Sequence, residues 1–259
     1  MSNQIENLEL APRLVGVLGE RIYLFDSVSS TNSFLAEADK PSLCLARRQT
    51  AGRGREGKRW ETLPGNIALS LSWPFANHQH MQSLSLVAGL ALVDFLADLG
   101  LQPGLKWPND LLLNECKLAG ILVESHQIPT GVMAVIGVGV NLLNHPRQQP
   151  GELPATHLAE VMEGSQLPTR LALSASLANH LFARITHLQT HGFASLRDRW
   201  MTHACWLHKR VHLGDESGVY QGIDDQGRLL MQTRQGLRVR PFVSGSLRLV
   251  SEEDRDTNA

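Results

Sequence analysis

The segment Val132-Met133-Ala134-Val135-Ile136-Gly137-Val138-Gly139-Val140 is a run of β-forming residues with two glycines in its second half. Side chains of a strand alternate between its two faces, so Gly137 and Gly139 lie on the same face. A glycine inside a strand packs nothing, which leaves room for a ligand or another backbone to approach closely. The segment therefore predicts a strand that floors a narrow apolar pocket.

Further strands and helices are expected on either side of this segment. Residues 117–124 form a strand after a hairpin turn at Asn114-Glu115. Residues 66–73 alternate apolar with small polar residues, and Pro74 should stop that strand. The remaining patterns are two strands at residues 21–25 and 43–46 and three helices at residues 81–99, 171–188 and 193–200. This mixture predicts an α+β fold in which a mixed or antiparallel sheet packs against helices.

The sequence pattern changes after residue 205. Short β-type runs separated by turns occupy residues 210–213, 219–223, 228–231, 237–239 and 246–250. Short strands at this spacing suggest a small β-barrel. We therefore divide the chain into a larger domain over residues 1–205 and a β domain over residues 206–259, whose charged tail from Ser251 should be frayed.

Composition and charge exclude several classes of protein. The 259-residue chain has a formal net charge of -1, which gives it no general affinity for nucleic acid or an anionic membrane. Its three cysteines, Cys44, Cys116 and Cys205, are widely spaced, which argues against a disulfide framework or a zinc site. We recognise no signal peptide and no apolar run near the ~20 residues that span a bilayer. These features predict a cytoplasmic protein without a membrane or DNA partner.

Residues Ala51–Trp60 combine glycines with arginines and a lysine. Glycine permits positive φ and brings backbone N–H groups close to a ligand, while arginine forks match phosphate or carboxylate oxygens. We therefore expect a mobile cationic loop that closes over an anion.

Other polar clusters extend this interpretation. Ser29-Ser30-Thr31-Asn32 precedes a helical pattern, either as a simple helix cap or as a set of ligand-binding groups. Lys106–Asp110 and Lys117–Gly120 add cations and an acid, Asp110, that could hold Mg²⁺. Together the clusters predict an enzyme that activates a small, mostly apolar carboxylic acid with ATP by positioning and charge stabilisation. We find no Walker A motif, Rossmann fingerprint or catalytic triad spacing.

Five of these segments, in this order, resemble the biotin–protein ligase family. They are Ser30–Asn32, Gln49–Arg55 with Trp60, Lys106–Asp110, Lys117–Glu124 and Gly137–Asn141. The resemblance implies a biotin/lipoate-ligase-type catalytic domain followed by an SH3-like β-barrel. It also implies a two-step reaction. Biotin and MgATP give biotinyl-5′-AMP and pyrophosphate, and the biotinyl group then passes to one lysine of a biotin carboxyl carrier protein, a subunit of acetyl-CoA carboxylase.

The resemblance also implies roles for residues at matching positions. Biotin would be bound by Ser30, Thr31, Asn32, Gln49, Gly52, Gly120 and Leu122. The nucleotide would be bound by Arg53, Gly54, Arg55, Trp60, Asn141 and Arg248. Lys117, with Arg53 and Arg55, would stabilise charge during catalysis, and Asp110 would help to place Mg²⁺.

The chain departs from the family pattern in its cationic loop. That loop often reads Gly-Arg-Gly-Arg-Arg-Gly-Arg, whereas Glu56 and Lys58 stand here. We expect Glu56 to point to solvent or to pair with Lys58 or Arg59. We do not recognise the N-terminal DNA-binding domain of repressor-type members. The resemblance therefore implies a ligase without transcriptional repression, and it admits a homodimer.

Three alternatives stay open at this point. A lipoate–protein ligase shares the fold and the adenylate chemistry, although the amino-acid sequences of Lys106–Asp110 and Gly52–Arg55 weigh against it. A non-catalytic biotin- or nucleotide-binding regulator would bind the ligand without turnover. An RNA-binding protein could use the Arg-Gly loop, but the near-neutral charge weighs against this.

Overall fold

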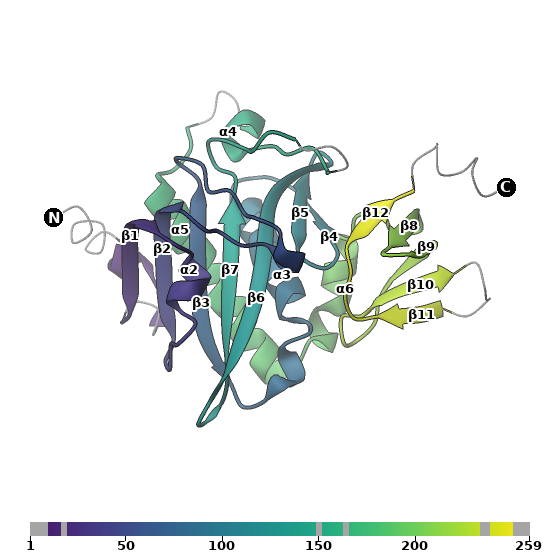
Figure 1. Ribbon diagram of the computed structural model, residues 1–259, viewed down its shortest axis with the longest axis horizontal. Coiled ribbons are helices and arrows are strands. Elements are labelled where there is room, and N and C mark those ends of the chain that lie inside the picture. The colour runs from purple at the N-terminus through teal and green to yellow at the C-terminus, as the bar shows by residue number, and fades with distance from the viewer. Residues whose placement is uncertain (1–9, 17–19, 149–151, 163–165, 234–238, 251–259) are drawn as a thin grey trace.

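A seven-stranded sheet is built from the first half of the chain (Figure 1). The structure, a computed structural model, describes residues 10–16, 20–148, 152–162, 166–233 and 239–250. The strand order is β1-β2-β3-β7-β6-β5-β4, with β1 and β2 parallel and the other neighbours antiparallel. The strands are β1 (Ile22–Val28), β2 (Ser42–Gln49), β3 (Ile67–Phe75), β4 (Gly104–Lys106), β5 (Asp110–Leu113), β6 (Cys116–Ile128) and β7 (Gly131–Val140).

Small residues lie side by side on one face of the three central strands. Ser70 of β3 is paired with Gly137 of β7, and Gly120 of β6 is paired with Gly139 of β7. The opposite face of β6 carries larger apolar side chains, such as Ile121, which packs close to α3 (Leu84–Ala97). One face of the sheet therefore packs into the core, and the other face has only small side chains at its centre.

Helices α3 and α5 (Arg170–His191) cover the core face of this sheet, behind it in Figure 1. Because α3 is apolar on nearly all sides, it is buried between the sheet and its helical neighbours. Asp94 of α3 forms ion pairs with Arg184 of α5 and with Arg199 of α6 (Ala194–Thr202). The other helical elements are η1 (Ala11–Arg13), α2 (Thr31–Phe34), η3 (Arg55–Gly57), η4 (His78–His80) and α4 (Leu158–Val161).

The last part of the chain forms a second, five-stranded antiparallel sheet with the order β11-β10-β9-β8-β12. Its strands are β8 (Arg210–Leu213), β9 (Glu216–Ile223), β10 (Leu229–Thr233), β11 (Val239–Phe242) and β12 (Leu247–Leu249). The expected small β unit is therefore present, while its closure into an SH3-like barrel stays a prediction.

Buried apolar residues of both sheets belong to one continuous core. Trp107 ties the two parts together, because its Nε1–H donates to the carbonyl oxygen of Gly227 at 3.0 Å. The division into residues 1–205 and 206–259 therefore stays a prediction, although the α+β class is confirmed.

The structure corrects the expected end of β3 at Pro74. The strand continues to Phe75, with Pro74 paired to Met133 of β7. On its other side, pairing with β2 stops at Ser72, so the missing N–H of Pro74 interrupts no ladder there. The expected strand start at residues 237–238 and the frayed tail from Ser251 fall outside the described residues. Among the described helices, none has the length and apolar character needed to cross a membrane.

Candidate active site

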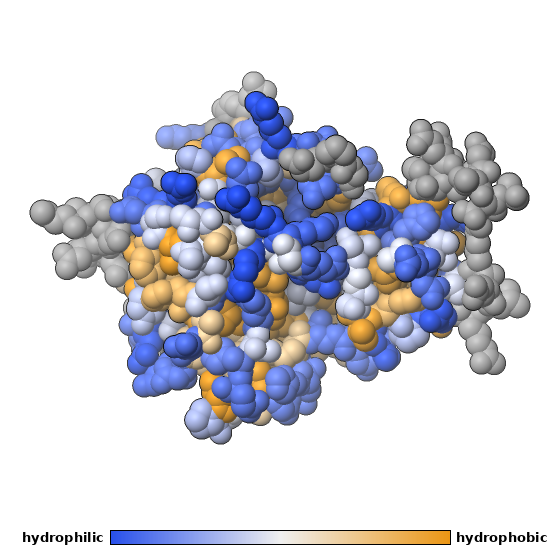
Figure 2. Space-filling model, viewed as in Figure 1, coloured by the Kyte–Doolittle hydropathy of each residue, from blue (hydrophilic) through white to orange (hydrophobic). Residues whose placement is uncertain are grey.

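A cavity of about 1220 Å³ opens above the small-residue face, between the first sheet and β12. Figure 2 looks onto this side of the molecule, where hydrophilic side chains gather across the middle. Of the residues to which the resemblance gave roles, all except Gly52 line this cavity. The sequence motifs, which lie far apart along the chain, therefore converge in one place.

One end of the cavity holds a buried hydrogen-bond network at the start of α2. Ser30 caps the helix, because its hydroxyl accepts from the N–H of Ser33 at 3.3 Å. The N–H and hydroxyl of Thr31 both donate to Gln49 Oε1, at 2.8 and 3.1 Å. The hydroxyl of Ser70 lies 2.7 Å from Thr31 Oγ1 and 2.6 Å from Asn32 Oδ1. The cluster can therefore cap the helix and also bind a ligand, because Ser30, Thr31 and Asn32 line the cavity.

Asn32 links this network to the cationic loop. Its Nδ2 donates to Glu124 Oε2 at 2.9 Å, and the same oxygen accepts from Arg53 Nη2 at 2.8 Å. Arg53 is therefore already paired with a carboxylate, whereas the sequence suggested that it would be available to a phosphate. Neither Glu124 nor Ser70 was singled out from the sequence as a site residue, because their roles depend on contacts across the sheet.

A buried carboxylate between two lysines lies in the wall of the cavity. Lys106 Nζ donates a hydrogen bond to Asp110 Oδ2 at 2.9 Å, while Asp110 Oδ1 lies 2.7 Å from Lys117 Nζ in an ion pair without hydrogen-bond geometry. Burial alone would raise the pKa of Asp110, but the two ammonium groups outweigh it and hold this pKa below its usual value. Asp110 is therefore ionised, and the three side chains together carry one net positive charge.

This arrangement does not fit the Mg²⁺ role expected for Asp110. Each carboxylate oxygen already has an ammonium group within 3 Å, and a dication bound to these oxygens would be repelled by both ammonium groups. Asp110 is better suited to hold Lys106 and Lys117 in position. Lys106 was missed as a site residue because its pairing needs the turn at Trp107-Pro108, which places Lys106 opposite Asp110 in the β4–β5 ladder.

The Trp60 ring fills the space over Gly120 and Gly139, where a ligand or another backbone was expected from the sequence. A Cβ atom added to Gly139 would lie 2.3 Å from Trp60 Cε2, and one added to Gly120 would lie 2.8 Å from Trp60 Cζ3. Gly137 makes the same kind of room for Asn32, whose Oδ1 would lie 2.3 Å from an added Cβ. Side chains, and not another backbone, make the close approach, and the approach of a ligand stays a prediction.

We expect Gly139→Ala to lower the free energy of unfolding by about 1–3 kcal/mol, because the added methyl group displaces the Trp60 ring. In a Trp60→Ala background the methyl group has space, so the same substitution should cost much less. Urea unfolding of the four proteins in this cycle measures the coupling. An equal cost in both backgrounds would show that Trp60 does not lie on this floor.

The cationic loop is folded into a tight turn over the cavity. Two backbone hydrogen bonds join the two ends of the loop. Gly54 N–H donates to Lys58 O at 2.7 Å, and Trp60 N–H donates to Gly52 O at 3.0 Å. Glu56 has a φ of 57° and is exposed, in line with the expectation that it points to solvent. The mobility of the loop stays a prediction.

Gly52 shapes the loop from behind the cavity. A Cβ atom on it would lie 2.4 Å from the carbonyl oxygen of Trp60, so only glycine lets the two ends of the loop meet. Because it does not line the cavity, its position argues against the direct biotin contact that the resemblance implied.

Arg55 and Asn141 face the remaining part of the cavity. Arg55 Nη1 lies 3.4 Å from both Asn109 Oδ1 and the carbonyl oxygen of Gly245, so the loop reaches the second part of the chain. Asn141 Nδ2 donates to the carbonyl oxygens of Thr156 and Lys117, while its buried Oδ1 has no hydrogen-bond partner within the described ranges. Arg248 of β12 is exposed on the opposite wall.

Comparison with known proteins places this chain in a family. Residues 22–141 match the family model described as the biotin/lipoate A/B protein ligase family. The biotin–[acetyl-CoA-carboxylase] ligase of Paracoccus denitrificans is 38% identical over 237 residues, which cover 83% of this chain and 96% of that protein. The chain belongs to the biotin–protein ligase family. Another family member, the bifunctional ligase/repressor BirA of Escherichia coli, is 32% identical over 94% of this chain and 78% of its own length.

Solved structures of biotin–protein ligases have the same fold. The ligase of Aquifex aeolicus in complex with biotin and ATP aligns with a TM-score of 0.73 at 27% identity, over 89% of this chain and all of the other. The ligase of Leishmania major in complex with biotinyl-5-AMP aligns with a TM-score of 0.59 over 86% of this chain and 99% of the other, and its 24% identity supports the fold alone. The expected family is confirmed.

Proposed function

We propose that this chain is a biotin–protein ligase that uses ATP to activate biotin and then transfers it to a lysine of a carrier protein. In the first step a carboxylate oxygen of biotin attacks the α-phosphorus of ATP, and pyrophosphate leaves with the electron pair of the broken P–O bond. In the second step the amine of the acceptor lysine attacks the carbonyl carbon of biotinyl-5′-AMP, and AMP leaves. The observation that carries the proposal is that Lys117, paired with Asp110, lines the same cavity as the polar network at α2 and the cationic loop.

The polar pocket at the start of α2 is proposed to hold the biotin ring. Thr31 and Gln49 are fixed by their mutual hydrogen bonds, so they can present hydroxyl and amide groups without losing further side-chain freedom. Gly120 and Leu122 of β6 supply the apolar wall along which the biotin chain would run. Biotin would then enter with its carboxylate directed toward Lys117.

The nucleotide is proposed to occupy the opposite end of the cavity. The buried Oδ1 of Asn141, which has no hydrogen-bond partner among the described residues, is an acceptor suited to an amino group such as that of adenine. Because it is buried, a hydrogen bond from a ligand to this atom would be favourable. Arg55 and Arg248 supply guanidinium groups for the phosphates. Arg53 would have to leave Glu124 before it could contribute.

Lys117 is proposed to stabilise the negative charge on the oxygens that join biotin to the α-phosphate. It lies on β6 beside the glycine floor, and its ammonium group is 5.6 Å from the centre of the Trp60 ring. Asp110 positions Lys117, and it keeps Lys106 within the same cluster. A positive group fixed before the reaction stabilises the transition state without reorganisation.

Incubation with biotin, MgATP and a purified carrier domain tests the proposal. We expect one lysine of the carrier domain to gain biotin, seen as a mass increase that is lost when that lysine is replaced by arginine. Pyrophosphate–ATP exchange should depend on biotin, and lipoate should not support it. Exchange with lipoate alone would identify a lipoate ligase, and biotin binding without exchange would identify a regulator; either result would overturn the proposal. The carrier, a homodimer and a cytoplasmic location stay predictions.

A further inference from the structure

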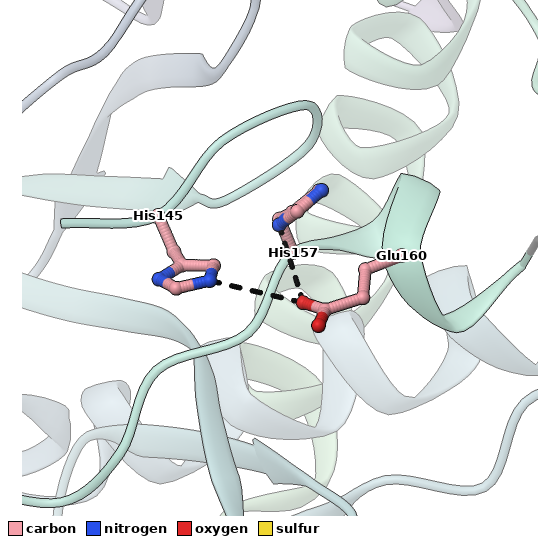
Figure 3. Close-up of side chains that lie close together, drawn as sticks. All are labelled: His145, His157 and Glu160. Carbon is pink, nitrogen blue, oxygen red and sulfur yellow. Dashed lines mark ion pairs between the residues drawn. The ribbon is translucent and has the colours of Figure 1, made fainter. Parts of the chain in front are cut away.

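Three potential metal ligands meet on the rim of the cavity, in the segment that follows β7. His145 lies in the cavity wall, and His157 and Glu160 lie at the start of α4 and within it. Their ligand atoms all lie within 4.8 Å of one another. Figure 3 shows both imidazole rings directed toward the Glu160 carboxylate from two separate stretches of chain.

The contacts among these three side chains are longer than good hydrogen bonds. His157 Nδ1 lies 3.4 Å and His145 Nε2 lies 3.8 Å from Glu160 Oε2. Atoms that share a tetrahedral zinc ion, with bonds of about 2.0–2.1 Å, lie about 3.3 Å apart. The two separations from Glu160 Oε2 are therefore close to those of ligands around one metal ion, and the third ligand pair lies within 4.8 Å.

The contact of His145 with a backbone carbonyl indicates which ring nitrogen is available to a metal ion. Its Nδ1 lies 3.1 Å from the carbonyl oxygen of Pro146, which can only accept, so Nδ1 carries the proton of this hydrogen bond. Nε2 of the neutral ring is then an acceptor facing a carboxylate. A second ring nitrogen that donates to a backbone carbonyl is the usual support of a metal-binding histidine.

His157 supplies an independent observation. Its Nδ1 is buried and has no hydrogen-bond partner in the part of the chain that the structure describes, since its contact with Glu160 is an ion-pair approach without hydrogen-bond geometry. Buried polar atoms are rarely left without a partner, so this atom calls for an explanation. Glu160 Oε2 is oriented by the hydroxyl of Thr156, which donates to it at 3.1 Å.

We propose that His145 Nε2, His157 Nδ1 and Glu160 Oε2 bind a Zn²⁺ ion at the rim of the cavity. Two imidazoles and one carboxylate form a donor set that suits Zn²⁺ and other late first-row metals, and not the hard cations Mg²⁺ or Ca²⁺, which prefer oxygen. The Glu160 side chain is 57% exposed, so water can complete the coordination from the solvent side. This site is separate from the Lys106–Asp110–Lys117 cluster.

The ion would join two elements around the nucleotide end of the cavity. His145 belongs to the cavity wall, while α4 is anchored to Asn141 because the N–H of Leu158 donates to the Asn141 carbonyl at 2.9 Å. A metal bond between His145 and α4 would therefore fix the wall next to Asn141. Its presence is expected to stabilise the fold whether or not biotin and ATP are the substrates.

Zinc binding to the untagged, chelator-treated protein provides the test. We expect a titration with Zn²⁺ to show one more tight site in the unmodified chain than in His157→Gln or Glu160→Gln, each of which should weaken that site by at least about tenfold. Zn²⁺ should raise the Tm of the unmodified chain and not that of the two variants. Co²⁺ in place of Zn²⁺ should give visible absorption bands that the variants lack.

His180→Gln is the matched control, since His180 also pairs with a carboxylate, Asp98, at 2.8 Å but has no third ligand beside it among the described residues. It should keep the full zinc content and the Tm shift. Circular dichroism of the metal-free variants checks that Glu160→Gln, an exposed substitution, leaves the fold intact. Equal zinc affinity in the unmodified chain and both variants, or no tight zinc binding at all, would overturn the proposal and leave a protonated histidine–glutamate cluster.

Discussion

Replacing Lys117 with alanine is expected to slow the formation of biotinyl-5′-AMP by about 10²–10³-fold, the usual cost of losing one preorganised group that stabilises transition-state charge. The fold should be little affected. Asp110 would still be paired with Lys106 at 2.9 Å, so its buried carboxylate would not be left without a cation. The loss should therefore appear in the rate and not in the free energy of unfolding.

Biotin-dependent pyrophosphate–ATP exchange measures this effect, and urea unfolding measures the stability of the same preparations. Lys40→Ala is the matched control, because Lys40 is an exposed lysine outside the cavity lining and should exchange at the normal rate. Lys117→Arg keeps the charge but changes its geometry, so it should fall between the two. Exchange by Lys117→Ala within a few-fold of the unmodified rate would refute the proposed role.

The second large effect is expected from Arg55→Gly, which should release biotinyl-5′-AMP about 10- to 100-fold faster. A charge-assisted hydrogen bond contributes about 1.5–3 kcal/mol, and Arg55 is the loop arginine best placed to supply one. Arg53 is held by Glu124 at 2.8 Å, whereas Arg55 makes two long contacts of 3.4 Å to uncharged oxygens. The structure thus separates two arginines to which the sequence gave the same role.

Rapid filtration after a single turnover without carrier measures how much biotinyl-5′-AMP leaves the protein. Arg47→Ala is the control, because Arg47 is exposed and pairs with Asp26 outside the cavity lining. Arg53→Gly should release less intermediate than Arg55→Gly, because the Arg53 guanidinium group is already paired with Glu124. Retention of the intermediate by Arg55→Gly at the level of the Arg47 control would contradict the proposed phosphate contact.

Local patterns were enough to predict most strands, and the family resemblance named many residues that line the cavity. The alternation at residues 66–73, the run from 132 to 140 and the helical spacing at 171–188 each correspond to an observed element. The extension of β3 through Pro74 was not predictable, because it depends on where β2 stops pairing. Periodicity reports which residues form a strand, but not which neighbour it has at each position.

The errors at the site have a related origin. The glycines at 137 and 139 were correctly placed on one face, but their sequence could not reveal that Asn32 and Trp60 would fill the space. Likewise, the i,i+4 spacing of Lys106 and Asp110 does not suggest a contact unless the chain reverses between them. These side-chain contacts depend on which distant segments of the chain meet, and local sequence patterns do not show this.

The two indoles in the cavity wall give this site an optical property. Lys117 lies 5.6 Å from the centre of the Trp60 ring, and Lys106 lies 5.8 Å from that of Trp206. The other three tryptophans of the chain, Trp73, Trp107 and Trp200, are outside the cavity lining. Since a nearby cation shifts the emission of an indole, any anion that draws these lysines away should change the intrinsic fluorescence. The same pair of contacts that organises the charge can therefore report its occupancy without a label.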